Sequence, residues 1–111
     1  MSAPQSPTDG NPETLSESAF LVLGEALLAR VESLAETATQ DIDVQRSGNV
    51  LNIELEDGHK LVVNLQTPMR EVWLAARTGG FHYQYVAASQ QWLDTRSNAE
   101  FFSVLLAFFN A

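Results

Sequence analysis

The chain has 111 residues, with 45% hydrophobic and 18% charged side chains, an ordinary mixture for one globular domain with one core. It contains no cysteine, which excludes disulfides, thiolate metal sites and cysteine nucleophiles. The formal net charge of −8 is uneven, because residues 1–57 carry 11 acidic and 2 basic side chains whereas residues 58–111 carry 3 and 4. Such a field repels nucleic acid and attracts cations or basic proteins, unless it serves solubility alone.

Residues 1–13 differ in composition from the rest of the chain. They hold three of the four prolines and almost no large apolar residue, which predicts a disordered tail before a single domain at residues 14–111. The start lacks the basic and apolar segments of a secretory signal and the arginines of a mitochondrial transit peptide. Because no run approaches the roughly 18 apolar residues of a membrane span, we expect a cytoplasmic bacterial protein.

A helix is expected next, with Thr14 or Ser16 as its cap. Gly24 lies within its apolar face and is expected to let another element approach closely. On the opposite side Glu25, Glu32 and Glu36 are spaced by seven and four residues and form one acidic stripe, which solvation alone can explain. The apolar face recurs at spacings of three and four: Phe20, Leu23, Leu27, Val31 and Leu34, widened by Leu21 and Leu28.

The apolar period changes to two after residue 40, which predicts half-buried strands. The sequences SGN at 47–49 and DG at 57–58 are turn signals, and Pro68 must interrupt the ladder because it has no N–H group. The expected strands cover residues 41–44, 51–55, 61–65, 71–76, 81–86 and 91–94.

A second helix closes the domain. Ser97 with Glu100 predicts a capping box at its start, and the residues that follow supply a buried face: Phe101, Phe102, Leu105, Leu106 and Phe109. The order is therefore helix, about six antiparallel strands, helix. This order predicts an α+β two-layer sandwich, in which both helices cover one face of the sheet and the other face is open to water.

No catalytic set stands out in the sequence. His59 and His82 have no metal-binding spacing, and the glycines form no phosphate-binding loop. A conventional enzyme is therefore not expected. Asp41 and Asp43 alternate along the first strand, and we expect their common face to border the C-terminal end of the first helix. Carboxylates gathered there suit hard cations, weakly and at the surface.

A second candidate surface lies on the open face of the predicted sheet. Trp73 alternates with Val72 and Leu74, so it faces solvent if those two face the helices. By the same alternation Asn64 and His82 share its face. An exposed tryptophan among polar side chains is a common anchor for a protein partner, although a reversed strand phase would make Trp73 a core residue.

Several segments together resemble the frataxin family. Residues 64–76 (NLQTPMREVWLAA) resemble its N-x-Q-x-P-x-x-x-[VI]-W-[LI]-[AS] core, and residues 79–83 (GGFHY) resemble the G-G-[YF]-H-[FY] of its bacterial branch. Shorter likenesses are D-I-D at 41–43, G-x-V-L at 48–51 and the E-[ND]-G-x-K hairpin at 56–60. Trp92, Asp94 and Arg96 resemble the W-x-x-D-R approach to the last helix, with the aspartate one position earlier.

The resemblance implies an α-β-sheet-α fold and a protein that acts by binding. It implies docking through an acidic ridge on the cysteine desulfurase and scaffold complex that assembles iron–sulfur clusters, and regulation of the rate of that complex. It also implies weak binding of ferrous and ferric iron on the same ridge. A monomer with iron-dependent oligomers is expected. The acidic ridge falls on Glu25, Glu32, Glu36, Asp41 and Asp43. The partner surface falls on Asn64, Gln66, Trp73 and His82.

Two alternatives remain open at this point. The chain could be a ferroxidase or an iron store, or an acidic adaptor without a metal role. The end of the first helix is less acidic than is usual in the family, because residues 37–40 (TATQ) carry no carboxylate. This dilution predicts fewer or weaker iron sites.

Overall fold

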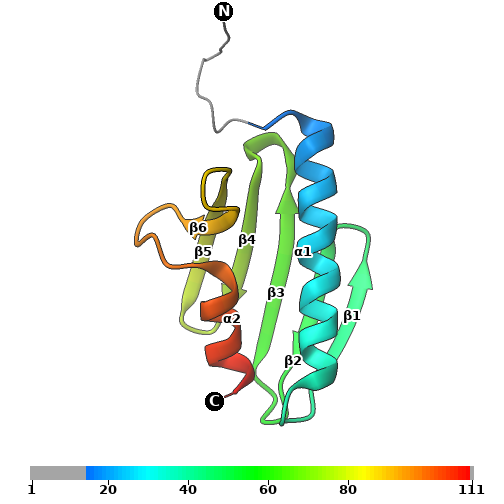
Figure 1. Ribbon diagram of the computed structural model, residues 1–111. Coiled ribbons are helices and arrows are strands. Elements are labelled where there is room, and N and C mark those ends of the chain that lie inside the picture. The colour runs from blue at the N-terminus through cyan, green and yellow to red at the C-terminus, as the bar shows by residue number, and fades with distance from the viewer. Residues whose placement is uncertain (1–14, 111) are drawn as a thin grey trace, which may run out of the picture.

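The structure is a computed structural model that describes residues 15–110, which form two helices and one six-stranded antiparallel sheet (Figure 1). The tail expected at residues 1–13 lies outside the described residues. The strands follow one another across the sheet in chain order, so each pairs with its sequence neighbours. The elements are α1 (Glu17–Thr37), β1 (Asp43–Ser47), β2 (Val50–Glu54), β3 (Lys60–Gln66), a 3₁₀ turn (Thr67–Met69), β4 (Glu71–Ala76), β5 (Gly79–Val86), β6 (Gln91–Asp94) and α2 (Phe101–Phe109).

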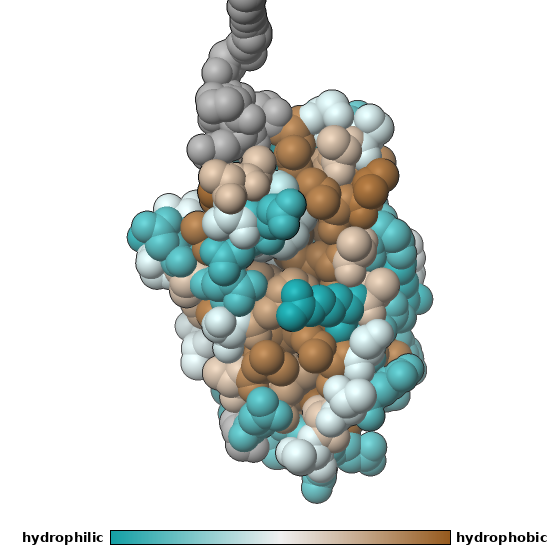
Figure 2. All heavy atoms as spheres, in the orientation of Figure 1, coloured by the Kyte–Doolittle hydropathy of each residue, from teal (hydrophilic) through white to brown (hydrophobic). Residues whose placement is uncertain are grey.

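The two helices lie side by side over one face of the sheet, and the other face is open, which confirms the predicted two-layer α+β class (Figure 1). Apolar side chains gather over and between the helices (Figure 2). On this side the Arg30 guanidinium lies 4.1 Å from the centre of the Phe102 ring and so links α1 to α2. Neither described helix combines the length and apolarity that a membrane crossing requires.

α1 begins after Ser16, one of the two predicted caps, and the other, Thr14, lies outside the described residues. The Ser16 hydroxyl caps it by accepting the Ala19 N–H at 3.1 Å. Its apolar stripe is buried against the sheet, and a Cβ atom added at Gly24 would come within 2.8 Å of Leu65 on β3. The expected close approach at Gly24 is therefore confirmed, and it is what lets α1 lie flat on the sheet.

The start of α2 differs from the predicted capping box. Glu100 itself is the N-cap, and its carboxylate accepts the N–H groups of Phe102 and Ser103 at 2.9 and 3.0 Å. Ser97 lies in the preceding turn, where its hydroxyl accepts the Ala99 N–H. The prediction of Ser97 as the helix cap was wrong, because the carboxylate of Glu100, one residue before the helix, reaches the free N–H groups directly.

The end of α2 is held by a side chain that is distant in the sequence. The Gln40 amide donates to the carbonyl groups of Phe108 and Phe109 at 3.2 and 2.7 Å. The same side chain accepts the Glu56 N–H at 3.1 Å. Gln40 thus ties the segment after α1, the turn after β2 and the last turn of α2 together, and it satisfies carbonyl groups that a helix end leaves free.

Candidate functional site

The open face of the sheet brings three of the four predicted partner-binding residues into one row. Asn64 on β3 is directly opposite Trp73 on β4, and Trp73 is directly opposite His82 on β5. Directly opposed residues in antiparallel strands point to the same side of the sheet. Gln66 starts the next row on the same face, opposite Glu71. We call Asn64, Gln66, Trp73 and His82 the sheet-face patch.

Trp73 lies on this open face and is half-buried. Its neighbours along the strand, Val72 and Leu74, point to the other face and are buried under the helices. The predicted strand phase is therefore correct. The indole stacks on the His82 imidazole, with ring centres 4.3 Å apart and planes only 7° from parallel. Its Nε1–H donates to Glu71 Oε1 at 2.8 Å. The two rings form one face-to-face pair whose orientation is fixed by the stack and by the hydrogen bond.

Glu71 is the residue of this site that the sequence analysis missed. It is only 5% exposed, although it lies on the face that no helix covers. Besides Trp73, it accepts the Gln84 side-chain amide at 3.2 Å, and its Oε1 lies 3.5 Å from His82 Nδ1. The available signal was spacing: Glu71 lies two residues before Trp73 on the same strand, hence on the same face.

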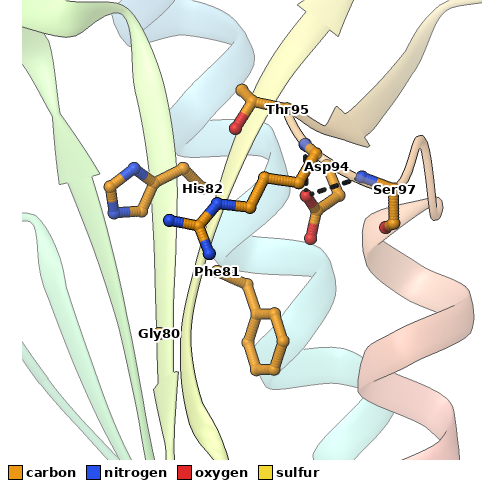
Figure 3. Close-up of a pocket in the computed structure, with 7 residues that line it drawn as sticks. Gly80, Phe81, His82, Asp94, Thr95 and Ser97 are labelled. Atoms are coloured by element: carbon orange, nitrogen blue, oxygen red, sulfur yellow. Dashed lines mark hydrogen bonds between the residues drawn. The ribbon is translucent and has the colours of Figure 1, made fainter.

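A cavity of about 250 Å³ adjoins His82 beyond the end of β6 (Figure 3). The buried Asp94 forms part of its wall, but Asp94 Oδ1 already accepts the N–H groups of Arg96 and Ser97 at 2.7 and 3.2 Å. This carboxylate shapes the turn after β6 and is not free to bind a ligand through that oxygen.

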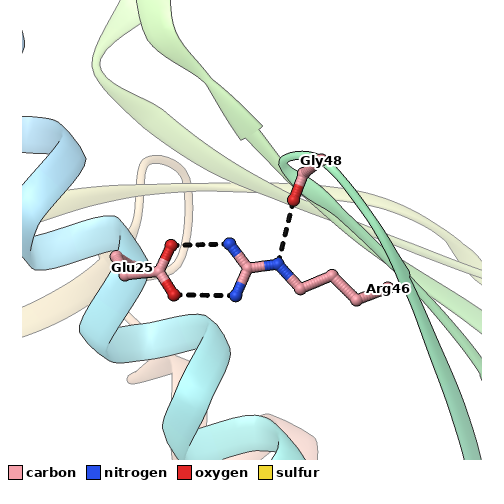
Figure 4. Close-up of polar contacts among 3 residues, drawn as sticks. All are labelled: Glu25, Arg46 and Gly48. Atoms are coloured by element: carbon pink, nitrogen blue, oxygen red, sulfur yellow. Dashed lines mark hydrogen bonds and ion pairs between the residues drawn. The ribbon is translucent and has the colours of Figure 1, made fainter.

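The predicted acidic ridge begins with an ion pair. Glu25 on α1 binds Arg46 on β1 through two hydrogen bonds, at 2.7 and 2.5 Å, and Arg46 Nε also donates to the Gly48 carbonyl (Figure 4). The hydrogen bonds from Arg46 hold the pKa of the Glu25 carboxyl below its usual value, and the same contact raises the pKa of Arg46. Glu25 is thus partly neutralised.

The other ridge residues do not share one face. Glu32 and Glu36 lie along α1, half-buried and exposed respectively. Asp41 precedes β1 and is exposed; its N–H donates to Glu56 Oε1 at 2.8 Å. Asp43 is opposite Glu54 in the sheet register.

Asp43 therefore does not lie where the sequence analysis expected it. Its neighbour Val44 packs on the core and Arg46 reaches α1, so the alternation turns Asp43 to the open face of the sheet. A shallow depression there is shared by Asp43, Glu54 and Lys60. The prediction that Asp43 lies next to the C-terminal end of α1 is therefore wrong, because polar residues that alternate with core residues along a strand point away from the helix layer.

The donor set does not form a cage for a metal ion. Among residues 15–110, no three His, Asp or Glu side chains come close enough together to hold one. The exposed carboxylates of α1 and the following loop fit loose, outer-surface attraction of a hard cation rather than chelation.

Comparison with known proteins places this fold in a family. A family model described as a frataxin-like domain matches residues 13–110. Proteins named iron–sulfur cluster assembly protein CyaY from Ralstonia pickettii and Paraburkholderia phymatum are 50% and 46% identical over 95 and 91 residues. These alignments cover 82% of this chain, and 82% and 85% of the respective relatives.

Solved structures agree with the family match. A frataxin of the CyaY family from Psychromonas ingrahamii superposes with a TM-score of 0.77 at 35% identity, covering 85% of this chain and 88% of that one. A trimeric frataxin from Saccharomyces cerevisiae, solved in complex with ferrous iron, has a TM-score of 0.61 at 22% identity over 86% of this chain and 83% of its own, a likeness of fold alone. From its motifs, its fold and these relatives, the chain belongs to the frataxin family.

Proposed function

We propose that this protein is an iron–sulfur cluster assembly factor that acts by binding. It docks on the cysteine desulfurase and scaffold complex and regulates the rate of cluster synthesis. The relatives named as cluster assembly proteins are 46–50% identical to the chain over most of its length, which supports this role. Those names describe assembly proteins rather than enzymes, in keeping with a regulator that works through contacts.

The observation that carries the proposal is the sheet-face patch. Trp73 and His82 form one stacked surface on a face that neither helix covers, and Asn64 extends the row. Aromatic side chains held in a fixed orientation lose little conformational entropy on binding, so they make good anchors at protein interfaces. We assign the contact with the scaffold and desulfurase to this patch.

The acidic ridge supplies a second, longer-range contribution. Glu32 and Glu36 add negative charge to a chain of net charge −8, and such a surface attracts a basic partner and speeds its association. Iron is the cargo or effector in this proposal. We assign its weak binding to Glu32, Glu36 and Asp41, with Glu25 and Asp43 contributing through their field. Iron bound in this way changes how well the complex turns over.

An NMR titration of the ¹⁵N-labelled protein tests both assignments. Addition of the desulfurase and of the scaffold, each separately, should shift or broaden the resonances of Asn64, Gln66, Trp73 and His82. Fe²⁺ without oxygen should instead perturb Glu32 and Glu36, and leave Trp73 unchanged. If the protein partners perturb only α1 and leave the sheet-face patch unchanged, the docking assignment is wrong.

A second candidate is an acidic adaptor without a metal role. The Glu25–Arg46 ion pair favours it, because it removes one carboxylate of the ridge from cation binding. In that case Fe²⁺ should leave the α1 resonances unchanged at concentrations where the protein partners still bind. A measured shift of Glu32 and Glu36 with Fe²⁺ would instead exclude the adaptor.

A further inference from the structure

Glu71 is an unusual residue for the open face of a sheet. Its side chain is 7% exposed, whereas that of His82 beside it is 47% exposed. A carboxylate removed from water is costly unless hydrogen-bond donors replace the lost water. Here the Trp73 indole N–H and the Gln84 amide do so, at 2.8 and 3.2 Å.

We propose that Glu71 is a positioning residue for the sheet-face patch, and this inference rests on the docking function proposed above. Its carboxylate accepts the Trp73 indole N–H and lies beside the His82 imidazole, so the two rings are presented to the partner as one rigid stacked pair. Glu71 itself does not touch the partner, since its neighbours leave almost none of its surface exposed.

The geometry explains why this position needs an acceptor. A tryptophan on a sheet face can rotate about two side-chain bonds, and its indole N–H would otherwise turn towards water. The bond to Glu71 Oε1 selects one orientation, and in that orientation the ring is parallel to His82 within 7°. Because its N–H is already used, Trp73 offers a partner apolar ring atoms and not a hydrogen-bond donor.

His82 belongs to the same arrangement. Its Nδ1 lies 3.5 Å from Glu71 Oε1, the oxygen that accepts the Trp73 N–H, and its imidazole stacks on the Trp73 indole. One carboxylate oxygen therefore lies beside both rings of the stack.

The first test uses the free protein with two substitutions, Glu71→Gln and Glu71→Leu. Glutamine keeps an oxygen that can accept the Trp73 N–H but lacks the charge that attracts His82, whereas leucine removes both. Indole N–H exchange with solvent, followed by NMR, should be about tenfold faster for Trp73 in Glu71→Leu and close to wild type in Glu71→Gln. Trp92, buried on the helix side, serves as an internal reference that should not change.

The comparison with Trp92 separates positioning from a general effect on stability. A general loss of stability in Glu71→Leu would speed exchange at both indoles, whereas a loss of positioning speeds it at Trp73 alone. Equal exchange rates in wild type and Glu71→Leu would overturn the inference, and so would equally fast exchange of Trp73 in Glu71→Gln and Glu71→Leu.

The second test measures affinity for the desulfurase–scaffold complex. Glu71→Leu should weaken binding about tenfold, and Glu71→Gln should restore it to within about twofold. Glu17→Gln removes one charge in the exposed first turn of α1, on the other layer, and should bind as wild type. If Glu71→Gln binds as poorly as Glu71→Leu, charge rather than positioning is what matters. If the wild type does not bind at all, the docking function fails, while the exchange measurement still decides the role of Glu71.

Discussion

The sheet-face patch and the acidic ridge were both expected from the sequence, yet the fold treats them differently. In the patch, Asn64, Trp73 and His82 come from three strands and lie directly opposite one another. In the ridge, the carboxylates are divided between α1, a loop and the open side of β1, and Glu25 is paired with Arg46. Backbone hydrogen bonds fix which residues are neighbours in a sheet, whereas charge patterns along a chain fix no distance.

The largest expected effect concerns the patch. Trp73→Ala should weaken binding to the desulfurase–scaffold complex by about 2 kcal/mol, roughly 30-fold, because it removes the central ring and leaves His82 without its stack. Calorimetric titration measures the change. Val22→Ala is the matched control, since Val22 is an apolar residue 71% exposed on α1, on the opposite layer. A loss of similar size in Val22→Ala would show that the patch is not the anchor.

Charge reversal on the ridge should have a smaller effect that depends on salt. Glu32→Lys combined with Glu36→Lys should weaken desulfurase binding about tenfold at 0.15 M salt, mainly through slower association. The deficit should shrink as salt rises, whereas the deficit of Trp73→Ala should not. Association rates measured over a salt series separate the two. Binding that survives the reversal unchanged at 0.15 M salt would remove the ridge from the docking surface.

The strands were predictable because apolar alternation and turn residues leave little choice of register. β4 and β6 have the expected bounds, 71–76 and 91–94, and the side that Trp73 occupies followed from its neighbours. The position of Asp43 was harder, since it depends on where the helix layer lies relative to an edge strand. The alternation along the strand correctly put Asp43 and Val44 on opposite faces. The prediction failed because it placed α1 on the Asp43 face, whereas α1 covers the Val44 face.

Polar partners at a distance were not predictable. Spacing places Glu71 on the same face as Trp73, but it does not indicate Gln84, the second donor, which comes from the next strand. Arg46 as the partner of Glu25 is a similar case, because the two residues are 21 positions apart. Such contacts depend on tertiary packing and on side-chain rotamers.

The two sides of β5 offer a third, smaller test. On the helix side, the Tyr83 hydroxyl is buried and has no hydrogen-bond partner among the described residues. Burial, together with the charges of Asp94 and Glu100, raises the pKa of Tyr83 to about 12. Tyr83→Phe should therefore leave the free energy of unfolding unchanged or raise it by up to about 1 kcal/mol, as measured in urea.

The matched substitution on the open side is His82→Phe, which keeps a ring for stacking but removes the nitrogen beside Glu71. It should lower partner affinity while changing stability little. A clear destabilisation by Tyr83→Phe would contradict this prediction, because it would mean that the Tyr83 hydroxyl makes a stabilising hydrogen bond, for example to a buried water.

The smallest effect is expected at the Glu25–Arg46 pair. The folded-state pKa of Glu25 is lowered from 4.5, so its contribution to stability is present above that value and is lost as the pH falls through the lowered pKa. Because both side chains are exposed, Glu25→Gln should lower stability only slightly at pH 7. Denaturant curves over a pH series should show the difference from wild type disappearing in acid. A difference that persists in acid would mean that Glu25 acts through packing.

The order of the strands also has a consequence for how the chain folds. Because each strand hydrogen-bonds only to its neighbours in sequence, the sheet can grow hairpin by hairpin, without waiting for distant segments to meet. The row from Asn64 to His82 is complete within two such hairpins, well before α2 exists to close the far side. A nascent chain could therefore display this stacked pair of rings before its hydrophobic layer is sealed. Early association with a partner would then compete with final closure of the domain.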